Sequence, residues 1–228
     1  MSGGSHGIYR TPVMGVVGMD DRNIEGQFMD LHVNRQGALV TIDTVLQWAL
    51  EGRTFHAQQG NAATLVDLVE VAYDEDQPQF ALRVPTGVTA IPLSIALNFQ
   101  DQAGTNTHVI VSTTTNDIGA GTSTSLTESA MRSDAPHAAQ CIAQSLYTGN
   151  ATAATGLIEI ARVIDPFVAT AAGRLPGFRW SIREVAAIPI LVGPASLTVH
   201  AVSTTDGPEG FAEYVWAEFP TPDLVRKV

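Results

Sequence analysis

Alternating hydrophobic and polar residues run through most of the chain and predict β-strands. The pattern is clearest at 93–99, where Leu93, Ile95, Leu97 and Phe99 share one side of the run. Similar runs lie at 64–73, 80–84, 107–115, 157–164, 178–185, 188–192, 196–203 and 211–219, and two or three shorter ones lie between 13 and 40. Because successive side chains of a strand point to opposite faces, each run predicts a strand with one buried face.

Turn sequences between these runs predict which strands pair. QDQAGTN leads from the 93–99 run into the 107–115 run, and TTDGPEG leads from 196–203 into 211–219. Both contain glycine with asparagine or aspartate, residue types that tolerate tight bends. We therefore expect two hairpins, 93–99 with 107–115 and 196–203 with 211–219. The small, polar segment 116–127 is expected to be an exposed loop.

Two short stretches have features of helices. The first, at 43–52, has a capping residue at Thr41 or Asp43 and ends at Gly52. Its apolar face is predicted to consist of Val45, Leu46 and Ala49 or Leu50. The second candidate is HAAQCIAQSLY at 137–147, which follows a cap-then-proline start.

The sequence Ala-Ile-Pro followed by an aliphatic residue occurs twice, at 90–93 and at 187–190. Proline has no N–H to donate to a sheet ladder, so it belongs at strand starts, edges or corners. We expect Pro92 and Pro189 each to mark the start of a strand. A turn at Gly87 precedes the first, and Gly193-Pro194 breaks the second stretch into two pieces.

Many short strands, few helices and turn signals about every ten residues predict an all-β fold. The expected architecture is a jelly-roll-like antiparallel β-sandwich with one or two short helices. Regular strand–helix alternation is missing, which disfavours a parallel α/β sheet. Residues 1–12, rich in glycine, serine and histidine, are expected to be a flexible N-terminal arm. Residues 13–228 are expected to form a single β-sandwich domain.

Composition narrows the range of partners. The chain of 228 residues is 45% hydrophobic, which is enough for a sizeable core, and has a formal net charge of −11. Its single lysine is Lys227 and no basic stripe is present, so direct nucleic-acid binding is not expected. No run approaches the roughly 18 apolar residues of a transmembrane segment. The lone cysteine, Cys141, excludes an intrachain disulfide and is expected to be a buried hydrophobic residue.

The sequence carries no recognisable catalytic, cofactor-binding or metal-binding motif. The six histidines lack metal-ligand spacing, and neither a phosphate-binding loop nor a Gly-x-Ser-x-Gly elbow occurs. We therefore do not expect an enzyme, a cofactor or a metal. His108 and His200 are expected to be exposed or to lie at an interface. One alternative is a carbohydrate-binding or cupin-like module that uses Trp180, Trp216 and a histidine.

Three stretches carry a family resemblance: RTFHAQQGNAATLVD, RVPTGVTAIPLSIALNF and AAIPILVGPASLTVHAVSTTDGPEGFAEYVWAEF. Their pattern and order, from Arg53 to Phe219, resemble the single-jelly-roll capsid proteins of icosahedral, often membrane-containing, viruses of bacteria and archaea. The resemblance implies a viral structural protein made in the host cytoplasm and located in the virion. A major capsid protein that self-assembles into capsomers is expected first. A decoration, spike or tail-associated protein is the alternative within viruses.

The resemblance places function in contacts between proteins. The expected partners are further copies of this chain and other virion proteins, with an internal membrane as a neighbour in a membrane-containing virus. The candidate contact residues come from the apolar part of the N-terminal segment and from the aromatic C-terminal run. They are Ile8, Tyr9, Val13, Met14, Tyr214, Trp216 and Phe219.

Overall fold

The computed structural model of the protein describes residues 43–61, 63–100, 106–134, 137–150, 152–165, 177–185, 188–204 and 209–224. The chain divides into two units, 1–44 and 45–228, and the described structure lies almost entirely in the second. The predicted arm at 1–12 and the short strands predicted between 13 and 40 lie outside the described residues.

The described elements are mostly strands. In chain order they are α1 (Thr44–Leu50), β1 (Thr54–Gln59), β2 (Val66–Asp67), β3 (Phe80–Val84), β4 (Val88–Phe99), β5 (Thr107–Thr114), β6 (Thr122–Ser125), β7 (Glu128–Ala130), β8 (Ile142–Gly149), β9 (Ile158–Asp165), β10 (Gly177–Ser181), β11 (Leu191–Val192), β12 (Ala195–Val202), β13 (Glu209–Pro220) and α2 (Thr221–Leu224).

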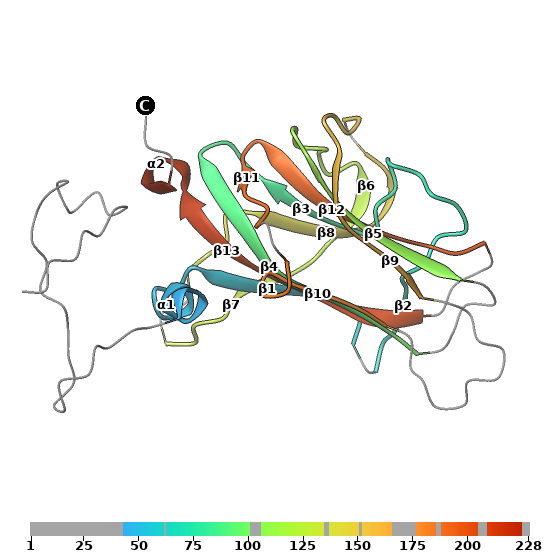
Figure 1. The fold of residues 1–228 in the computed structure, drawn as a ribbon, viewed down its shortest axis with the longest axis horizontal. Helices are drawn as coiled ribbons and strands as arrows, with labels where there is room; N and C mark the ends of the chain where they lie inside the picture. Colours follow the sequence, from blue (N-terminus) through green and yellow to red (C-terminus); the bar gives the residue numbers. More distant parts are fainter. Residues whose placement is uncertain are drawn as a thin grey trace, which may run out of the picture. The chain divides into compact units, whose positions relative to one another are not determined.

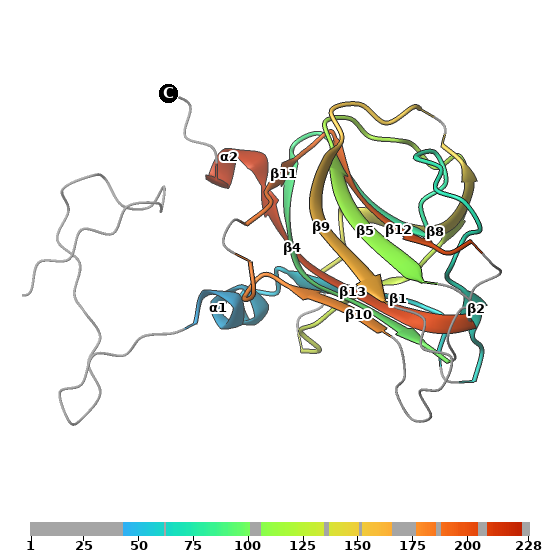
Figure 2. The same cartoon turned by 45° about the vertical axis from the view of Figure 1, so that its right-hand side comes forward.

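The strands form two antiparallel sheets that face each other, which confirms the prediction of an all-β sandwich (Figures 1 and 2). The seven-stranded sheet has the order β10-β4-β13-β1-β7, with β11 added to β4 and β2 added to β13. The six-stranded sheet has the order β6-β8-β3-β12-β5-β9.

Inward-facing side chains of both sheets make one main core. Phe80 of β3 stacks on Tyr214 of β13, with ring centroids 3.4 Å apart, and so joins the two sheets. Phe55 stacks on Trp216 within the seven-stranded sheet. All four rings are buried, and burial of each stabilises the fold by about 1.5–3 kcal/mol.

Pro92 lies inside β4, so the prediction that it starts a strand is wrong. Ser94 pairs with Val215 and Pro92 with Trp216, so Leu93 is an extra residue at a β-bulge. A bulge is a position where a strand tolerates proline. It also shifts the alternation: Ile95 points into the main core, whereas Leu93 packs in a second cluster with Phe219.

The strand that follows the second Ala-Ile-Pro stretch lies next to the first stretch. Leu191 and Val192 of β11 pair with Ala90 and Thr89 of β4, just before the bulge. The strand after Pro189 therefore starts two residues later than predicted. The expected break at Gly193-Pro194 is confirmed, because β11 belongs to the seven-stranded sheet and β12 to the six-stranded sheet.

Neither expected hairpin forms. β4 and β5 belong to different sheets, and so do β12 and β13. β12 already pairs with β3 and β5, and β13 with β1 and β4, so neither has a free edge for the other. The chain therefore changes sheet between the end of β4 and the start of β5, and again between the end of β12 and the start of β13.

The helix predictions had mixed outcomes. α1 confirms the first, and Gly52 follows it with a φ of 73°. Its partly buried side is formed by Val45 and Trp48, while Leu46 and Leu50 are exposed. The second prediction is wrong, because 142–149 forms β8 between β3 and β6, where its backbone groups complete the sheet.

Two further segments differ from their predictions. The run at 64–73 contains only the two-residue strand β2, and the adjacent Leu68 and Val69 are both buried in an irregular stretch. The expected loop at 116–127 contains β6, and Ile118 within it is fully buried with Ala81 and Tyr147. Loop residues therefore cover part of the outer side of the six-stranded sheet.

Candidate functional site

The candidate contact residues of the C-terminal run lie in the interior. Tyr214 and Trp216 are 2% and 1% exposed in the main core. Phe219 is 5% exposed beneath α1, where its ring lies 5.1 Å from that of Trp48. These rings hold the domain together and do not line its surface. Ile8, Tyr9, Val13 and Met14 lie outside the described residues.

The tryptophans do not form a sugar-binding platform. Trp180 of β10 and Trp216 of β13 are both buried in the main core. Trp48 is partly buried against the second cluster, on another side of the seven-stranded sheet. A stacking platform needs exposed ring faces, so the carbohydrate-binding alternative loses the residues on which it depended.

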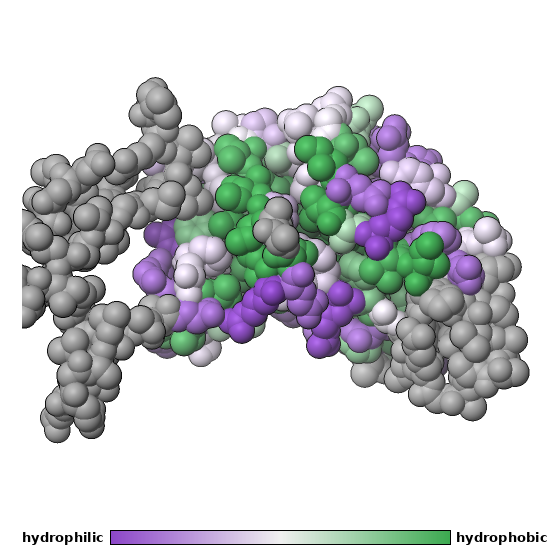
Figure 3. All heavy atoms as spheres, viewed as in Figure 1, coloured by the Kyte–Doolittle hydropathy of each residue, from purple (hydrophilic) through white to green (hydrophobic). Residues whose placement is uncertain are grey.

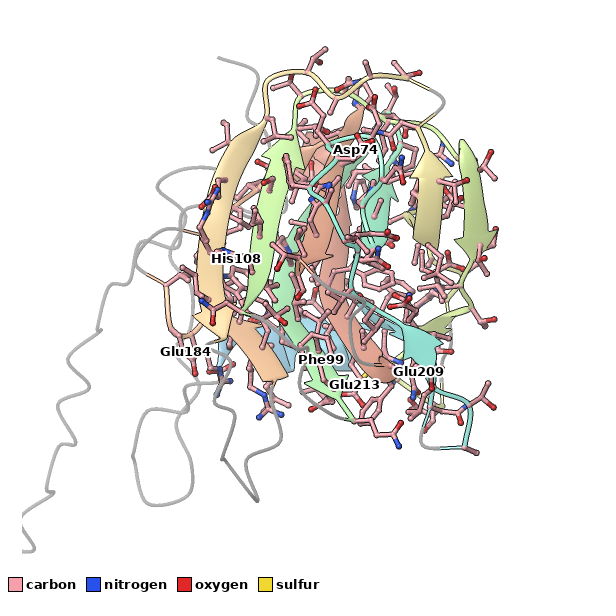
Figure 4. The ribbon with its side chains drawn as sticks, turned by 90° about the vertical axis from the view of Figure 1, so that its right-hand side faces the viewer. Asp74, Phe99, His108, Glu184, Glu209 and Glu213 are labelled. Carbon is pink, nitrogen blue, oxygen red and sulfur yellow. The ribbon has the colours of Figure 1, made fainter. Side chains whose placement is uncertain are left out.

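His200 is buried, contrary to prediction. It is 2% exposed on β12, and its ring lies 5.0 Å from that of Tyr73 in the segment between β2 and β3. Glu70 and Gln79 at the ends of this segment donate backbone hydrogen bonds to Ala201 and Val199 on either side of the histidine. Figure 4 shows the segment, with Asp74 labelled, lying over the sheet. Burial lowers the pKa of His200 to about 4.

A buried carboxylate was missed at the sequence level. Glu218 is 5% exposed and accepts hydrogen bonds from the backbone N–H groups of Gln140 (2.7 Å) and Cys141 (3.1 Å). It also accepts one from Trp216 Nε1 at 2.7 Å. The signal was present, because Glu218 has the same strand parity as the inward-facing Trp216. Its role is to anchor the two residues that directly precede β8.

Cys141 itself is buried, as predicted, and its thiol is not positioned as a nucleophile. It is 2% exposed in the main core. Burial raises the pKa of the thiol, and the Glu218 carboxylate raises it further. A thiol held protonated in this way is unreactive.

The six-stranded sheet carries one ionic network on its outer side. Arg83 of β3 donates two hydrogen bonds to the carboxylate of Asp117, at 2.7 and 2.9 Å, and one to Gln144 Oε1. Tyr147 also donates to Gln144 Oε1. These bonds from Arg83 lower the pKa of Asp117. The network ties the 116–121 loop to the sheet.

No group of three histidine, cysteine, aspartate or glutamate residues among the described residues is placed to hold a metal ion. No helix of the described part is long and apolar enough to cross a membrane.

The surface of the described part offers exposed hydrophobic residues. They lie on α1 (Leu46, Leu50), in the segment before β3 (Val71, Tyr73), near β7 and β8 (Met131, Ile142), along β9 (Leu157, Ile158, Val163, Ile164) and beside β11 (Ile188, Ile190, Val192). Figure 3 shows several hydrophobic groups on the side that carries β9 and β11. Such exposed hydrophobic positions are candidates for contacts with other proteins.

No protein-family model matches the chain, and no curated protein matches its sequence. Function is therefore inferred from the arrangement of the strands and from the surface.

Proposed function

We propose that this chain is a viral structural protein, a major capsid protein that assembles through its β-sandwich into capsomers of an icosahedral shell. The proposal joins the sequence resemblance to the order of the strands. It places the protein in the virion, with further copies of itself and other virion proteins as partners.

One observation carries the proposal: eight strands pair in a nested order. They are, along the chain, β1, β3, β4, β5, β9, β10, β12 and β13. The first pairs with the last (β1–β13), the second with the seventh (β3–β12), the third with the sixth (β4–β10) and the fourth with the fifth (β5–β9). Successive pairs alternate between the two sheets.

This nesting supports a jelly-roll topology. A long antiparallel ribbon of four strand pairs, wrapped so that its pairs alternate between two layers, would give the same order. Jelly rolls build many viral coats, as well as lectin and cupin domains. β6, β7 and β8 are then an insertion between the fourth and fifth strands, and they lengthen both sheets through β8–β3 and β7–β1 pairs.

The interior favours a structural role over a binding or catalytic one. Aromatic and aliphatic side chains fill the space between the sheets, where a cupin would carry its metal site. Glu218 and Arg83, whose side chains make three hydrogen bonds each, fasten loops to the sheets. The described domain exposes sheet edges and hydrophobic residues to other molecules. Such surfaces suit protein–protein contacts in an assembly.

Expression of the full chain, followed by size-exclusion chromatography and electron microscopy, tests the proposal. We expect capsomers or closed particles of uniform diameter that become more abundant with protein concentration. Phe80→Ala is the control for non-specific aggregation. It removes a stacked core ring at a cost of about 3–5 kcal/mol, so it should give irregular material or none.

A protein that stays monomeric across concentrations and salts, and that is missing from purified particles, would overturn the proposal. The number of copies per virion separates the alternative role. A shell protein is the most abundant chain of the particle, whereas a decoration or spike protein is present in far fewer copies and binds a preformed shell.

A further inference from the structure

β9 is the long exposed edge of the six-stranded sheet. It pairs with β5 on one side, and no described residue pairs with its other side. The other sheet ends among the described strands are shorter: β6 has four residues, β7 three and β10 five, against eight in β9. An unpaired edge of this length is a template for pairing with another strand.

Exposed hydrophobic side chains lie along much of this edge. Ile158 is 60% exposed, Ile164 51% and Val163 42%. The charged residues of the strand, Glu159 and Arg162, form an ion pair with each other at 2.6 Å. In Figure 3 a hydrophilic group lies over β9 with hydrophobic residues beside it.

The sequence of this edge is complementary to itself when it is read in the opposite direction. In LIEIARVI (157–164), an antiparallel copy places Leu157 opposite Ile164, Ile158 opposite Val163 and Glu159 opposite Arg162. Two hydrophobic pairs therefore lie on the outer side of each ion pair, and the same pairs recur in both halves of a two-fold contact. Hydrophobic and opposite-charge cross-strand pairs stabilise antiparallel sheets.

A β-bulge makes this register geometrically possible. In a regular strand, residues three apart such as 159 and 162 point to opposite faces and could not face each other across a two-fold axis. Here Glu159 pairs with Ser112 and Arg162 with Ile110, two positions apart on β5, because Ile160 is an extra residue. Glu159 and Arg162 consequently share a face, and so do Ile158 and Val163.

We propose that β9 pairs antiparallel with β9 of a second copy of this chain, in a two-fold contact that joins the two six-stranded sheets into one continuous sheet. Glu159 of each copy then pairs with Arg162 of the other. The inference deepens the proposed assembly function by naming one contact of the shell, and it rests on that function only for its place in a particle.

A charge swap tests the contact. Arg162→Glu alone and Glu159→Arg alone put like charges opposite each other in both halves of the interface. Each should raise the dimer dissociation constant about tenfold or more in sedimentation equilibrium. The double variant Glu159→Arg/Arg162→Glu restores both pairs and should return the constant to near the wild-type value. Equal dimerisation of all four proteins would overturn the proposal.

Cysteine cross-linking tests the register. Positions 158 and 163 are about 15 Å apart along one strand, too far for an intrachain disulfide. In the proposed register Ile158 of one copy faces Val163 of the other. Oxidation should therefore join the double variant Ile158→Cys/Val163→Cys into covalent dimers, while each single variant stays uncross-linked. Cys141 does not interfere because it is buried.

The outcomes separate this contact from the proposed function. If the wild type forms particles but neither the charge swap nor the cysteines have the expected effect, the β9 contact is wrong and the shell function stands. If the wild type dimerises through β9 but forms no particles under any condition, the contact stands and the shell function is wrong.

Discussion

Single polar residues in the interior of this domain determine where irregular segments attach. Glu218 receives three N–H donors although it lies on a strand among aromatic residues. His200 lies beneath the segment that connects β2 to β3. The Glu218 carboxylate stabilises the fold only while its hydrogen-bond donors are in place, and the buried His200 ring resists protonation, so both residues make measurable predictions.

Glu218→Gln should lower the free energy of unfolding by about 2 kcal/mol. The glutamine amide keeps one acceptor oxygen but replaces the other with a donor, which would face an N–H of the 140–141 backbone or of Trp216. Urea unfolding followed by tryptophan fluorescence measures the change. Glu213→Gln is the matched control, because Glu213 is exposed on the same strand and should change the value by less than about 0.5 kcal/mol. Equal effects of the two substitutions would contradict the role given to Glu218.

His200 should make the domain lose stability between about pH 6.5 and pH 4. Its pKa falls from an ordinary 6.5 to about 4 on folding, so in this window the unfolded chain binds a proton that the folded chain does not. The stability is fully present above the unfolded pKa and is lost as the pH falls, by about 3 kcal/mol in total. The stability that Asp117 contributes is lost at lower pH, as the pH falls from its ordinary pKa of 3.8 through its lowered pKa in the fold.

The measurement is urea unfolding at a series of pH values from 7 to 4. His200→Leu should remove most of the slope in this window, whereas the exposed His137→Gln should leave it in place. A slope that persists unchanged in His200→Leu would show that other groups cause it.

At the scale of the element, the sequence predicted where strands lie better than which strands pair. Alternation located β3, β5, β9, β12 and β13 to within a few residues, because each has one face in the core. It failed at β8, because the three alanines of HAAQCIAQSLY (137–147) have helical propensity, whereas the neighbouring strands supply the backbone partners that decide the outcome. The two predicted hairpins were wrong because the same turn residues can connect strands of different sheets as well as neighbouring strands of one hairpin.

The Ala-Ile-Pro stretches show the same limit. Proline correctly signalled an irregularity in each, but its type depends on the neighbouring strand. Only the pairing with β13 reveals that Pro92 lies at a bulge, and only the pairing with β4 shows that β11 continues beside it. A local sequence has no information about a partner that lies a hundred residues away.

Gly193→Ala should destabilise the domain by about 3 kcal/mol or more. Gly193 joins β11 to β12, and a Cβ there would overlap the backbone carbonyl oxygen of Pro85 at the turn before β4. Backbone cannot move aside as a flexible side chain can, so this corner between the sheets would have to open. Gly149→Ala at the end of β8 is the control, because a Cβ at that position meets nothing within 4 Å. Thermal unfolding by circular dichroism compares the two, and equal melting temperatures would contradict the tight corner.

At the scale of the whole molecule, the fold class was predictable and the candidate contact surface largely was not. Aromatic residues such as Tyr214 and Trp216 serve cores and interfaces equally well, so composition alone could not assign them, and they proved to be core. The β9 edge, in contrast, was visible as the LIEIARVI run, whose hydrophobic residues flank two opposite charges. The sequence alone does not show that this strand lies at the edge of a sheet.

Removal of residues 1–42 should separate folding from assembly. Among the described residues, the three hydrophobic clusters draw their side chains from 45–219, so the shortened chain should keep its circular dichroism spectrum and unfold cooperatively. Its free energy of unfolding, measured in dilute solution, should be within about 1 kcal/mol of the full-length value. If Ile8, Tyr9, Val13 and Met14 contact neighbouring copies, the same truncation should sharply lower the yield of particles. Full-length protein with these four residues changed to serine is the matched variant, and it should lose particles to a similar extent. Normal particle yield from both proteins would remove the four residues from the interface and leave the shell to edges such as β9.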